Sequence, residues 1–126
     1  MMIRSLRSLI AATALALAFS GLAHAANTAV QRVITVKSDN VAAYIQELDK
    51  GRAMMKKLGI NTTLRIWRAT FAGPNAGTVV VTQEYASLTA LAEANAKTAA
   101  DPEFSKWLAA LDKVRTITSD SLYREL

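Results

Sequence analysis

The stretch Glu84–Leu111, EYASLTALAEANAKTAADPEFSKWLAAL, is the most informative part of the chain because it contains the end of a strand and two helix starts. Ser87 is a residue type that caps helices, and apolar residues recur behind it at helical spacing. Asp101-Pro102 marks a second start, with aspartate as the cap and proline at the first helical position. The pattern predicts one broken or kinked helical unit over Ser87–Lys113.

A strand and a helix are predicted before this stretch. Ala29–Lys37 is rich in β-branched residues and predicts the first strand. Apolar residues then recur at spacings of three, four and seven over Val41–Leu58, which predicts a helix capped by one of the residues 38–40 and ended by Gly59. Gly51 lies within the apolar stripe, where glycine costs helix stability, and we expect it to permit a close approach to the sheet.

Three further strands complete the pattern. Ile60–Ala72 and Thr78–Tyr85 are strand-like and flank the turn signal Gly73–Gly77, so they form a hairpin. Arg115–Arg124 predicts the last strand. The order βαββαβ is the ferredoxin-like arrangement, an α+β fold whose four-stranded antiparallel sheet carries its helices on one face.

The hairpin gives a register if Ala72 pairs with Thr78. Side chains then alternate between the two faces of the sheet. One set faces the helices: Arg65, Trp67, Ala69, Phe71, Val79, Val81, Gln83 and Tyr85. The other set, which is mixed in polarity, places Arg68 and Glu84 close enough to interact. This mixed face suits a homodimer interface in which two sheets meet.

The first 25 residues have the pattern of a signal peptide. Arg4 and Arg7 precede an apolar run, Leu9–Phe19, and Ala23-His24-Ala25 matches an A-x-A cleavage site. We expect cleavage after Ala25, a periplasmic or secreted protein, and one domain over residues 26–126 with no membrane association.

Composition excludes several classes of chemistry. The chain has no cysteine, and its one histidine, His24, lies in the predicted leader. Zinc sites built from Cys and His, histidine-ligated haem and Ser-His-Asp triads are therefore not expected. Basic and acidic residues are interspersed, and without Arg4 and Arg7 the formal charge falls from +5 to +3. We expect no nucleic-acid partner, no metal and no cofactor.

Tyr85-x-x-Leu88 followed by Asp101-Pro102-x-Phe104 resembles the NIPSNAP pattern. NIPSNAP proteins belong to the dimeric α/β-barrel superfamily, beside the antibiotic-biosynthesis-type monooxygenases. The resemblance implies a homodimer whose two sheets form a barrel, with a small-molecule cleft between each sheet and its helices. NIPSNAP-like sequences usually carry arginines where this chain has Leu91 and Asn95, and related monooxygenases often carry a histidine on that helix, which is absent here.

The best candidate ligand site combines residues of the hairpin and of the helix above it. Arg65 has a planar fork that binds anions, and Trp67 has a face on which a flat ring can stack. Gln83 and Tyr85 can orient a carbonyl or hydroxyl group, and Asn95 is a polar residue on an apolar helical face. Each also has an ordinary structural interpretation, as core packing, a backbone hydrogen bond or a solvated head group. No catalytic residue is identified.

Three functions remain open on these grounds. The first is binding of a small aromatic or anionic molecule in the sheet–helix cleft. The second is a cofactor-independent monooxygenase or isomerase that acts on a small aromatic substrate. The third is a structural or accessory subunit. Fold alone does not choose among these functions. The absence of a histidine from the predicted mature chain favours binding over catalysis.

Overall fold

The computed structural model describes residues 28–126, so the predicted leader lies outside the described residues. The elements are, in chain order, β1 (Val30–Lys37), α2 (Val41–Lys57), β2 (Thr63–Arg68), the short 3₁₀ turn η1 (Gly73–Asn75), β3 (Val79–Tyr85), α3 (Leu88–Ala99), α4 (Pro102–Leu111) and β4 (Thr116–Arg124). The predicted βαββαβ order is confirmed, and the predicted break in the second helical unit separates α3 from α4.

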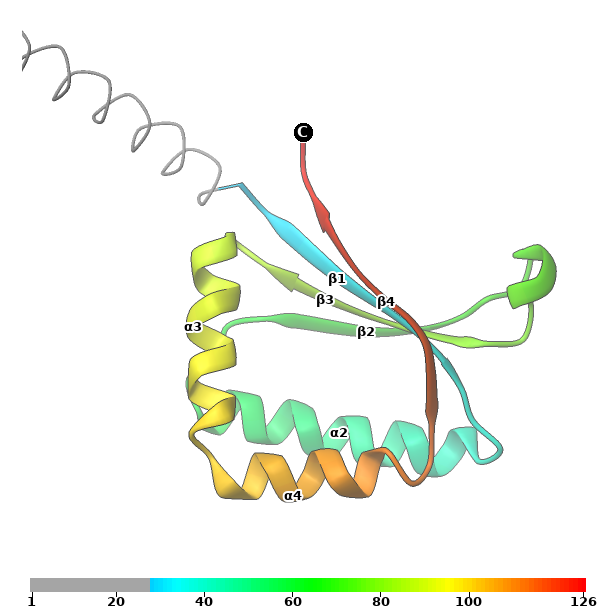
Figure 1. Cartoon of the computed structure of the whole chain (residues 1–126), viewed down its shortest axis with the longest axis horizontal. Helices are drawn as coiled ribbons and strands as arrows, with labels where there is room; N and C mark the ends of the chain where they lie inside the picture. The colour runs from blue at the N-terminus through cyan, green and yellow to red at the C-terminus, as the bar shows by residue number, and fades with distance from the viewer. Residues whose placement is uncertain (1–27) are drawn as a thin grey trace, which may run out of the picture.

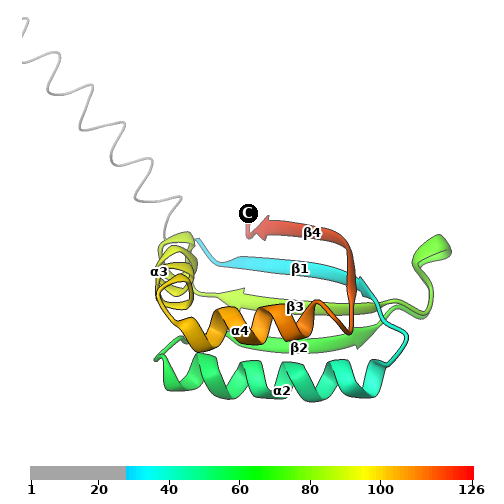
Figure 2. The ribbon, with the colours of Figure 1, turned by 60° about the horizontal axis from the view of Figure 1, so that its bottom comes forward.

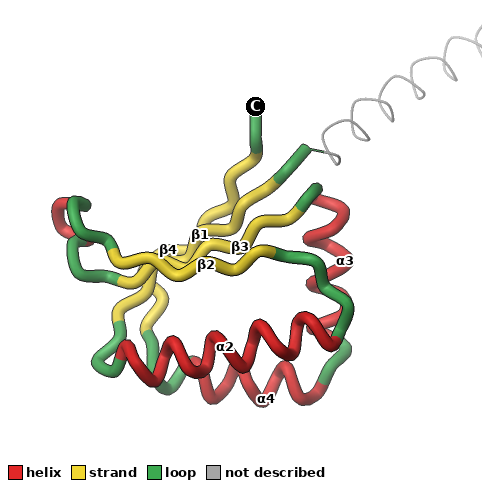
Figure 3. The backbone as a smooth tube through the Cα atoms, turned by 180° about the vertical axis from the view of Figure 1, so that it is seen from behind, coloured by secondary structure: helices red, strands yellow, loops and turns green. Residues whose placement is uncertain are grey.

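The strands form one antiparallel sheet in the order β2-β3-β1-β4, which Figure 2 shows. Helices α2 and α4 lie along one face of this sheet, and α3 crosses one end (Figure 1). Seen from behind in Figure 3, the sheet and the helix pair form two layers that α3 closes on one side. This is the expected ferredoxin-like fold, and no helix of the described residues is long and apolar enough to cross a membrane.

Each helix starts at a capping residue that the sequence offered. Asn40 accepts a hydrogen bond from the backbone N–H of Ala43 at 3.0 Å, and Ser87 accepts one from Ala90 at 3.0 Å. Asp101 accepts from the N–H of Glu103 at 3.3 Å, directly before Pro102. Side-chain oxygens thus replace the missing intrahelical partners of the first N–H groups.

The core lies between the sheet and the helix pair. Its most deeply buried side chains come from four elements or their ends: Tyr44, Leu111, Val36 and Val81. The indole of Trp107 on α4 lies against Gly51 on α2, where a Cβ atom would overlap the ring. Its Nε1–H donates to the carbonyl of Glu47 at 2.8 Å. Gly51 therefore permits a close approach to α4, whereas the sequence pattern predicted a close approach to the sheet.

The predicted hairpin register is wrong by three residues. Arg65 pairs with Thr82, where Tyr85 was expected. The strands close at Ala69, whose N–H donates to Thr78 O at 2.9 Å and whose carbonyl accepts from Gly77 at 2.7 Å. The intervening chain includes the turn η1, so the connection is longer than the predicted five-residue turn, and β2 is correspondingly shorter than Ile60–Ala72.

An odd shift in register moves each β2 side chain to the opposite face. Leu64 therefore joins the core beneath the helices, whereas Trp67 lies on the face without helices and donates from Nε1 to Thr82 Oγ1 at 3.0 Å. The predicted Arg68–Glu84 pair is also wrong, because Arg65 contacts Glu84 at 3.6 Å. The guanidinium of Arg68 instead donates to the carbonyl of Gly77 at 3.4 Å.

We expect Gly51→Ala to destabilise the fold, although alanine usually favours a helix over glycine. The added methyl group would force Trp107 away from α2, and overpacking of this kind costs about 1–3 kcal/mol in the free energy of unfolding. Urea denaturation followed by circular dichroism measures this loss.

The matched control is the same substitution in a Trp107→Phe background, where the smaller ring leaves room for the methyl group. The cost of Gly51→Ala should shrink there, which a double-mutant cycle quantifies. An equal cost in both backgrounds would contradict the role given to this contact.

Candidate functional site

A cavity of about 370 Å³ lies between the sheet and the helices. Its walls come from β1, β2 and β3 on one side and from α2, α3 and α4 on the other. Pockets that hold small molecules are typically about 300–1,000 Å³ and mostly apolar, with a few polar groups that orient the ligand. The cavity therefore has the size of a site for a compact organic molecule.

Most of the wall is apolar and aromatic. The rings of Phe104 and Trp107 are 5.0 Å apart between centroids and tilted by 55°. The aliphatic part of the wall consists of Ile34, Leu48, Met55, Ile60, Leu64, Val81, Ala94, Ala99, Leu108 and Leu111. Asn95, Ser105 and Leu108 are exposed members of the wall on α3 and α4, so the cavity opens between these two helices.

The structure brings together three of the five predicted site residues. Gln83 and Tyr85 line the cavity from β3, and Asn95 lines it from α3. Gln83 is half-buried and Tyr85 is buried, whereas Asn95 is exposed at the mouth, in contrast to the buried position expected for it. None of these three side chains forms a hydrogen bond with another described residue. Their polar groups are available to a ligand.

Arg65 and Trp67 do not lie in this cavity. Both are on the opposite face of the sheet, where Arg65 contacts Glu84 and Trp67 is 51% exposed. The cause is the three-residue register shift. It places each β2 side chain on the face opposite to the predicted one, whereas Gln83 and Tyr85 on β3 lie on the predicted face. The predicted constellation is therefore divided between two faces.

Two arginines that the sequence argument did not single out line the cavity, Arg32 on β1 and Arg115 just before β4. Arg32 has a sequence signal, because it occupies the same alternation as the buried residues Val30, Ile34 and Val36. Arg115 has none, since it follows α4 in a short connection whose conformation sets its direction.

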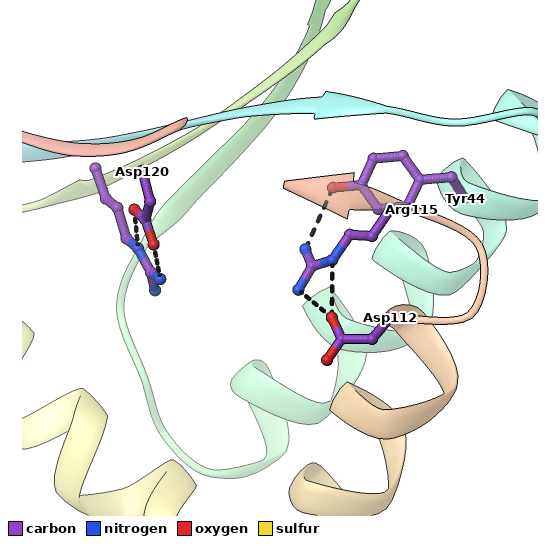
Figure 4. A network of polar contacts seen from close by, with 5 residues as sticks. Tyr44, Asp112, Arg115 and Asp120 are labelled. Atoms are coloured by element: carbon purple, nitrogen blue, oxygen red, sulfur yellow. Dashed lines mark hydrogen bonds and ion pairs between the residues drawn. The ribbon is translucent and has the colours of Figure 1, made fainter. Parts of the chain in front are cut away.

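Arg32 forms a two-point ion pair with Asp120 on β4. Its Nε and Nη2 donate to the two carboxylate oxygens at 2.9 and 2.6 Å. These bonds lower the pKa of the Asp120 carboxyl from its ordinary value of 3.8, and they raise the pKa of the guanidinium. The charge of Arg115 lowers the pKa of Asp120 further. Figure 4 shows Asp120 and Arg115 on two sides of the space beneath β1.

Arg115 lies in a second group, with Tyr44 and Asp112. Its Nε and Nη2 both donate to one oxygen of Asp112 at 3.3 Å, and Nη1 donates to the hydroxyl of Tyr44 at 3.4 Å. Burial raises the pKa of the Tyr44 hydroxyl, and the bond from Arg115 opposes that rise. The dashed lines in Figure 4 trace these contacts.

A larger hollow, of about 620 Å³, opens at the end of the sheet. It is lined mainly by exposed or polar residues, among them Asn61, Thr63, Arg124 and Glu125. Its aromatic residues are Tyr85 and Tyr123, and the paired rings of Phe104 and Trp107 are not part of its wall. The sheet–helix cavity is the better candidate site. Within residues 28–126 no cluster of three or more His, Cys, Asp or Glu could hold a metal ion.

Solved structures share this arrangement of elements. A NIPSNAP family protein from Agrobacterium tumefaciens is 19% identical, with a TM-score of 0.59 over 78% of this chain and 82% of that chain. A candidate antibiotic biosynthesis monooxygenase from Caulobacter crescentus is 16% identical, with a TM-score of 0.58 over 79% and 90%. SnoaB, a cofactor-independent oxygenase from Streptomyces nogalater, is 15% identical, with a TM-score of 0.59 over 76% and 91%.

This chain has the NIPSNAP and antibiotic-biosynthesis-monooxygenase fold. The resemblance inferred from Tyr85-x-x-Leu88 and Asp101-Pro102-x-Phe104 is confirmed at the level of fold. No protein-family model matches the sequence, and no curated protein matches it significantly. At these identities the similarity to NIPSNAP proteins establishes the fold alone, and the function must be argued from the site.

The Arg32–Asp120 pair predicts a specific acid dependence of stability. The pKa of Asp120 is lowered in the folded chain, so the unfolded chain binds this proton first as the pH falls. The contribution is fully present above the ordinary value of 3.8 and is lost as the pH falls through the lower folded value.

Asp120→Asn should therefore flatten the acid side of the plot of unfolding free energy against pH. The loss near neutral pH should be at most about 1 kcal/mol, because both side chains are 37% exposed. Arg32→Gln should flatten most of the same part of the plot, since it removes the largest cause of the lowered pKa and leaves the smaller effect of Arg115. If the unfolding free energy of both variants depended on pH in the acid range as steeply as that of the unsubstituted chain, the role given to the Arg32–Asp120 pair would be contradicted.

Proposed function

We propose that this chain binds a compact, largely apolar organic molecule in the sheet–helix cavity. The observation that carries the proposal is an aromatic-lined cavity of about 370 Å³ whose polar side chains Gln83, Tyr85 and Asn95 form no hydrogen bond with another described residue. No side-chain polar atom of the described residues is both fully buried and without a partner, so water reaches these groups when the cavity is empty and a ligand can replace that water. A ligand with a carbonyl or hydroxyl group would supply the partners.

The walls suit a flat molecule. Phe104 and Trp107 provide aromatic surface on α4, and the indole is held in place by its bond to the Glu47 carbonyl. A ring held against them would bury apolar area, and Gln83 on the facing strand could orient its polar substituent. A purely structural or accessory subunit would not need a cavity of this kind, so that role is the weaker alternative.

We also propose that two copies of the chain pair through the sheet face without helices. That face carries Val33, Thr82, Trp67 and Val80, and Trp67 remains half exposed in a single copy. Every residue of the edge strand β4 is exposed, including Tyr123 at 60%. Exposed apolar sheet surface and a long free edge favour association with another chain.

The predicted leader supports a further proposal, that the chain acts outside the cytoplasm after cleavage at Ala25. Native mass spectrometry of the protein purified from its source tests three proposals at once. The mass should correspond to residues 26–126, the assembly should contain two copies, and a small molecule should be retained. A single ligand-free copy would contradict the proposed pairing and give no support to the binding site.

Catalysis is the second candidate function. SnoaB is a cofactor-independent oxygenase with this fold, and the cavity of the present chain presents hydroxyl and amide groups beside aromatic rings. In such a reaction the substrate would supply the electrons and the protein would supply orientation. Oxygen consumption with phenols or quinols distinguishes the two functions, since a binding protein would show none.

The two tryptophans allow the cavity to be tested by fluorescence. The chain contains only Trp67 and Trp107, which lie on opposite faces of the sheet. In a Trp67→Phe variant, 1,4-naphthoquinone should quench Trp107 along a saturable binding curve, because the quinone would occupy the cavity beside the indole. The absence of cysteine removes the usual side reaction of quinones with thiols.

The matched control is Trp107→Phe, which leaves Trp67 as the reporter on the opposite face. Its quenching should rise in proportion to quinone concentration, as collisions produce. If Trp107 were also quenched without saturation, the cavity would not bind a molecule of this size and the proposal would fail.

The proposed pairing can be broken at its centre. Val80 lies on β3 within the face without helices, directly opposite Trp67. Val80→Lys should convert a two-copy species into single copies in sedimentation velocity, because it places a charge within an interface that excludes water. Circular dichroism checks that the fold persists.

Ile45→Lys is the control for this substitution. Ile45 is 37% exposed on α2, on the helical side of the molecule, so the same charge there should leave the assembly intact. A stable single copy without any substitution would refute the pairing.

A further inference from the structure

The charged residues in the cavity wall all have one sign. Among the described residues that line the cavity, the charged ones are Arg32 and Arg115, and none is acidic. The two come from distant parts of the sequence, β1 and the connection between α4 and β4. A largely apolar cavity with cationic groups and no carboxylate in its wall disfavours a cationic ligand and favours an anionic one.

Arg115 is the more buried of the two. Its side chain is 8% exposed, whereas that of its carboxylate partner Asp112 is 66% exposed. The three bonds that it forms, to Asp112 and to the hydroxyl of Tyr44, are 3.3–3.4 Å long. Charge-assisted N–H···O⁻ bonds are usually about 2.7–2.9 Å, so this buried cation is loosely paired.

Both guanidinium groups retain donors. A guanidinium has five N–H groups. The bonds of Arg115 engage one N–H on each of its three nitrogens, which leaves one on Nη1 and one on Nη2. Arg32 binds Asp120 through Nε and Nη2, so its Nη1 has no partner among the described residues. Figure 4 shows the guanidinium of Arg115 directed into the space beneath β1, toward the side of Asp120.

We propose that the ligand of this cavity is an organic monoanion, an apolar ring system that bears one carboxylate, and that Arg115 with Arg32 binds the carboxylate. The inference rests on the proposed binding function and specifies its ligand class. Each arginine is paired with one aspartate that does not line the cavity, so the formal charges cancel while free guanidinium donors still face the cavity, which suits one negative charge better than several. The ring then lies against Phe104 and Trp107.

This assignment replaces Arg65, the residue that the sequence suggested as an anion-binding group. Arg65 is 54% exposed on the other face of the sheet and has Glu84 as its partner. It therefore provides a matched control, because removal of its charge changes the formal charge of the chain by the same amount without altering the cavity.

The test is isothermal titration calorimetry with 2-naphthoate and its neutral isostere 2-naphthamide. The carboxylate should bind at least about tenfold more tightly than the amide, the size expected for a charge-assisted pair. Arg115→Met should remove most of that difference while retaining amide binding, which shows that the variant is folded. Arg65→Met should leave both affinities unchanged, and Arg115→Lys should give an intermediate loss, because it keeps the charge but not the planar fork.

The possible results distinguish failure of the proposed ligand class from failure of the proposed binding function. If the amide binds as tightly as the carboxylate and Arg115→Met changes neither affinity, the cavity binds a neutral molecule, and the inference fails while the proposed function stands. If neither probe binds, the proposed function and the inference both fail. A tenfold loss of naphthoate affinity in Arg65→Met would also overturn the inference, since that residue lies outside the cavity.

Discussion

The pairing of Ala69 with Thr78 fixes the face of the sheet on which every β2 side chain lies. The N–H of Ala69 donates to Thr78 and its carbonyl accepts from Gly77, which closes the hairpin. Alternation along the strand then places Leu64 in the core and Trp67 outside it. A shift by one residue would exchange them, placing the indole on the helical side of the sheet and the leucine on the open face. The volume of the cavity and the polarity of the open face both depend on this closure.

A second constraint sets the spacing of the helical layer. Because Gly51 has no side chain, the indole of Trp107 lies directly on α2 and its N–H reaches the Glu47 carbonyl. This draws α4 against α2, while α3 spans the end of the sheet (Figure 3). The cavity is thus the space that remains when two helices pack closely together and the third lies across the end.

The sequence predicted the elements well because each has a local physical cause. The caps Ser87 and Asp101 start helices wherever the chain carries them, and the apolar stripe of α2 has helical periodicity. The hairpin register has no such local cause. In Thr63–Arg68, TLRIWR, both alternating sets contain an arginine and a large apolar residue, so alternation alone does not identify the buried face. The 3₁₀ turn at Gly73–Asn75 lengthens the connection and so sets the register, and the sequence pattern did not predict that turn.

The same reasoning explains which site residues could be found. Gln83 and Tyr85 share one face of β3 with the buried residues Val79 and Val81, so alternation alone identifies that face as the one beneath the helices, where the structure has them. Their neighbours on β3, Thr82 and Glu84, point to the open face one residue away. The wall of the cavity and the face proposed for pairing are therefore two sides of one central strand. Because a strand is stiff and its faces alternate, a second copy on the open face would brace the residues that face the ligand, and binding and pairing would stabilise the same element.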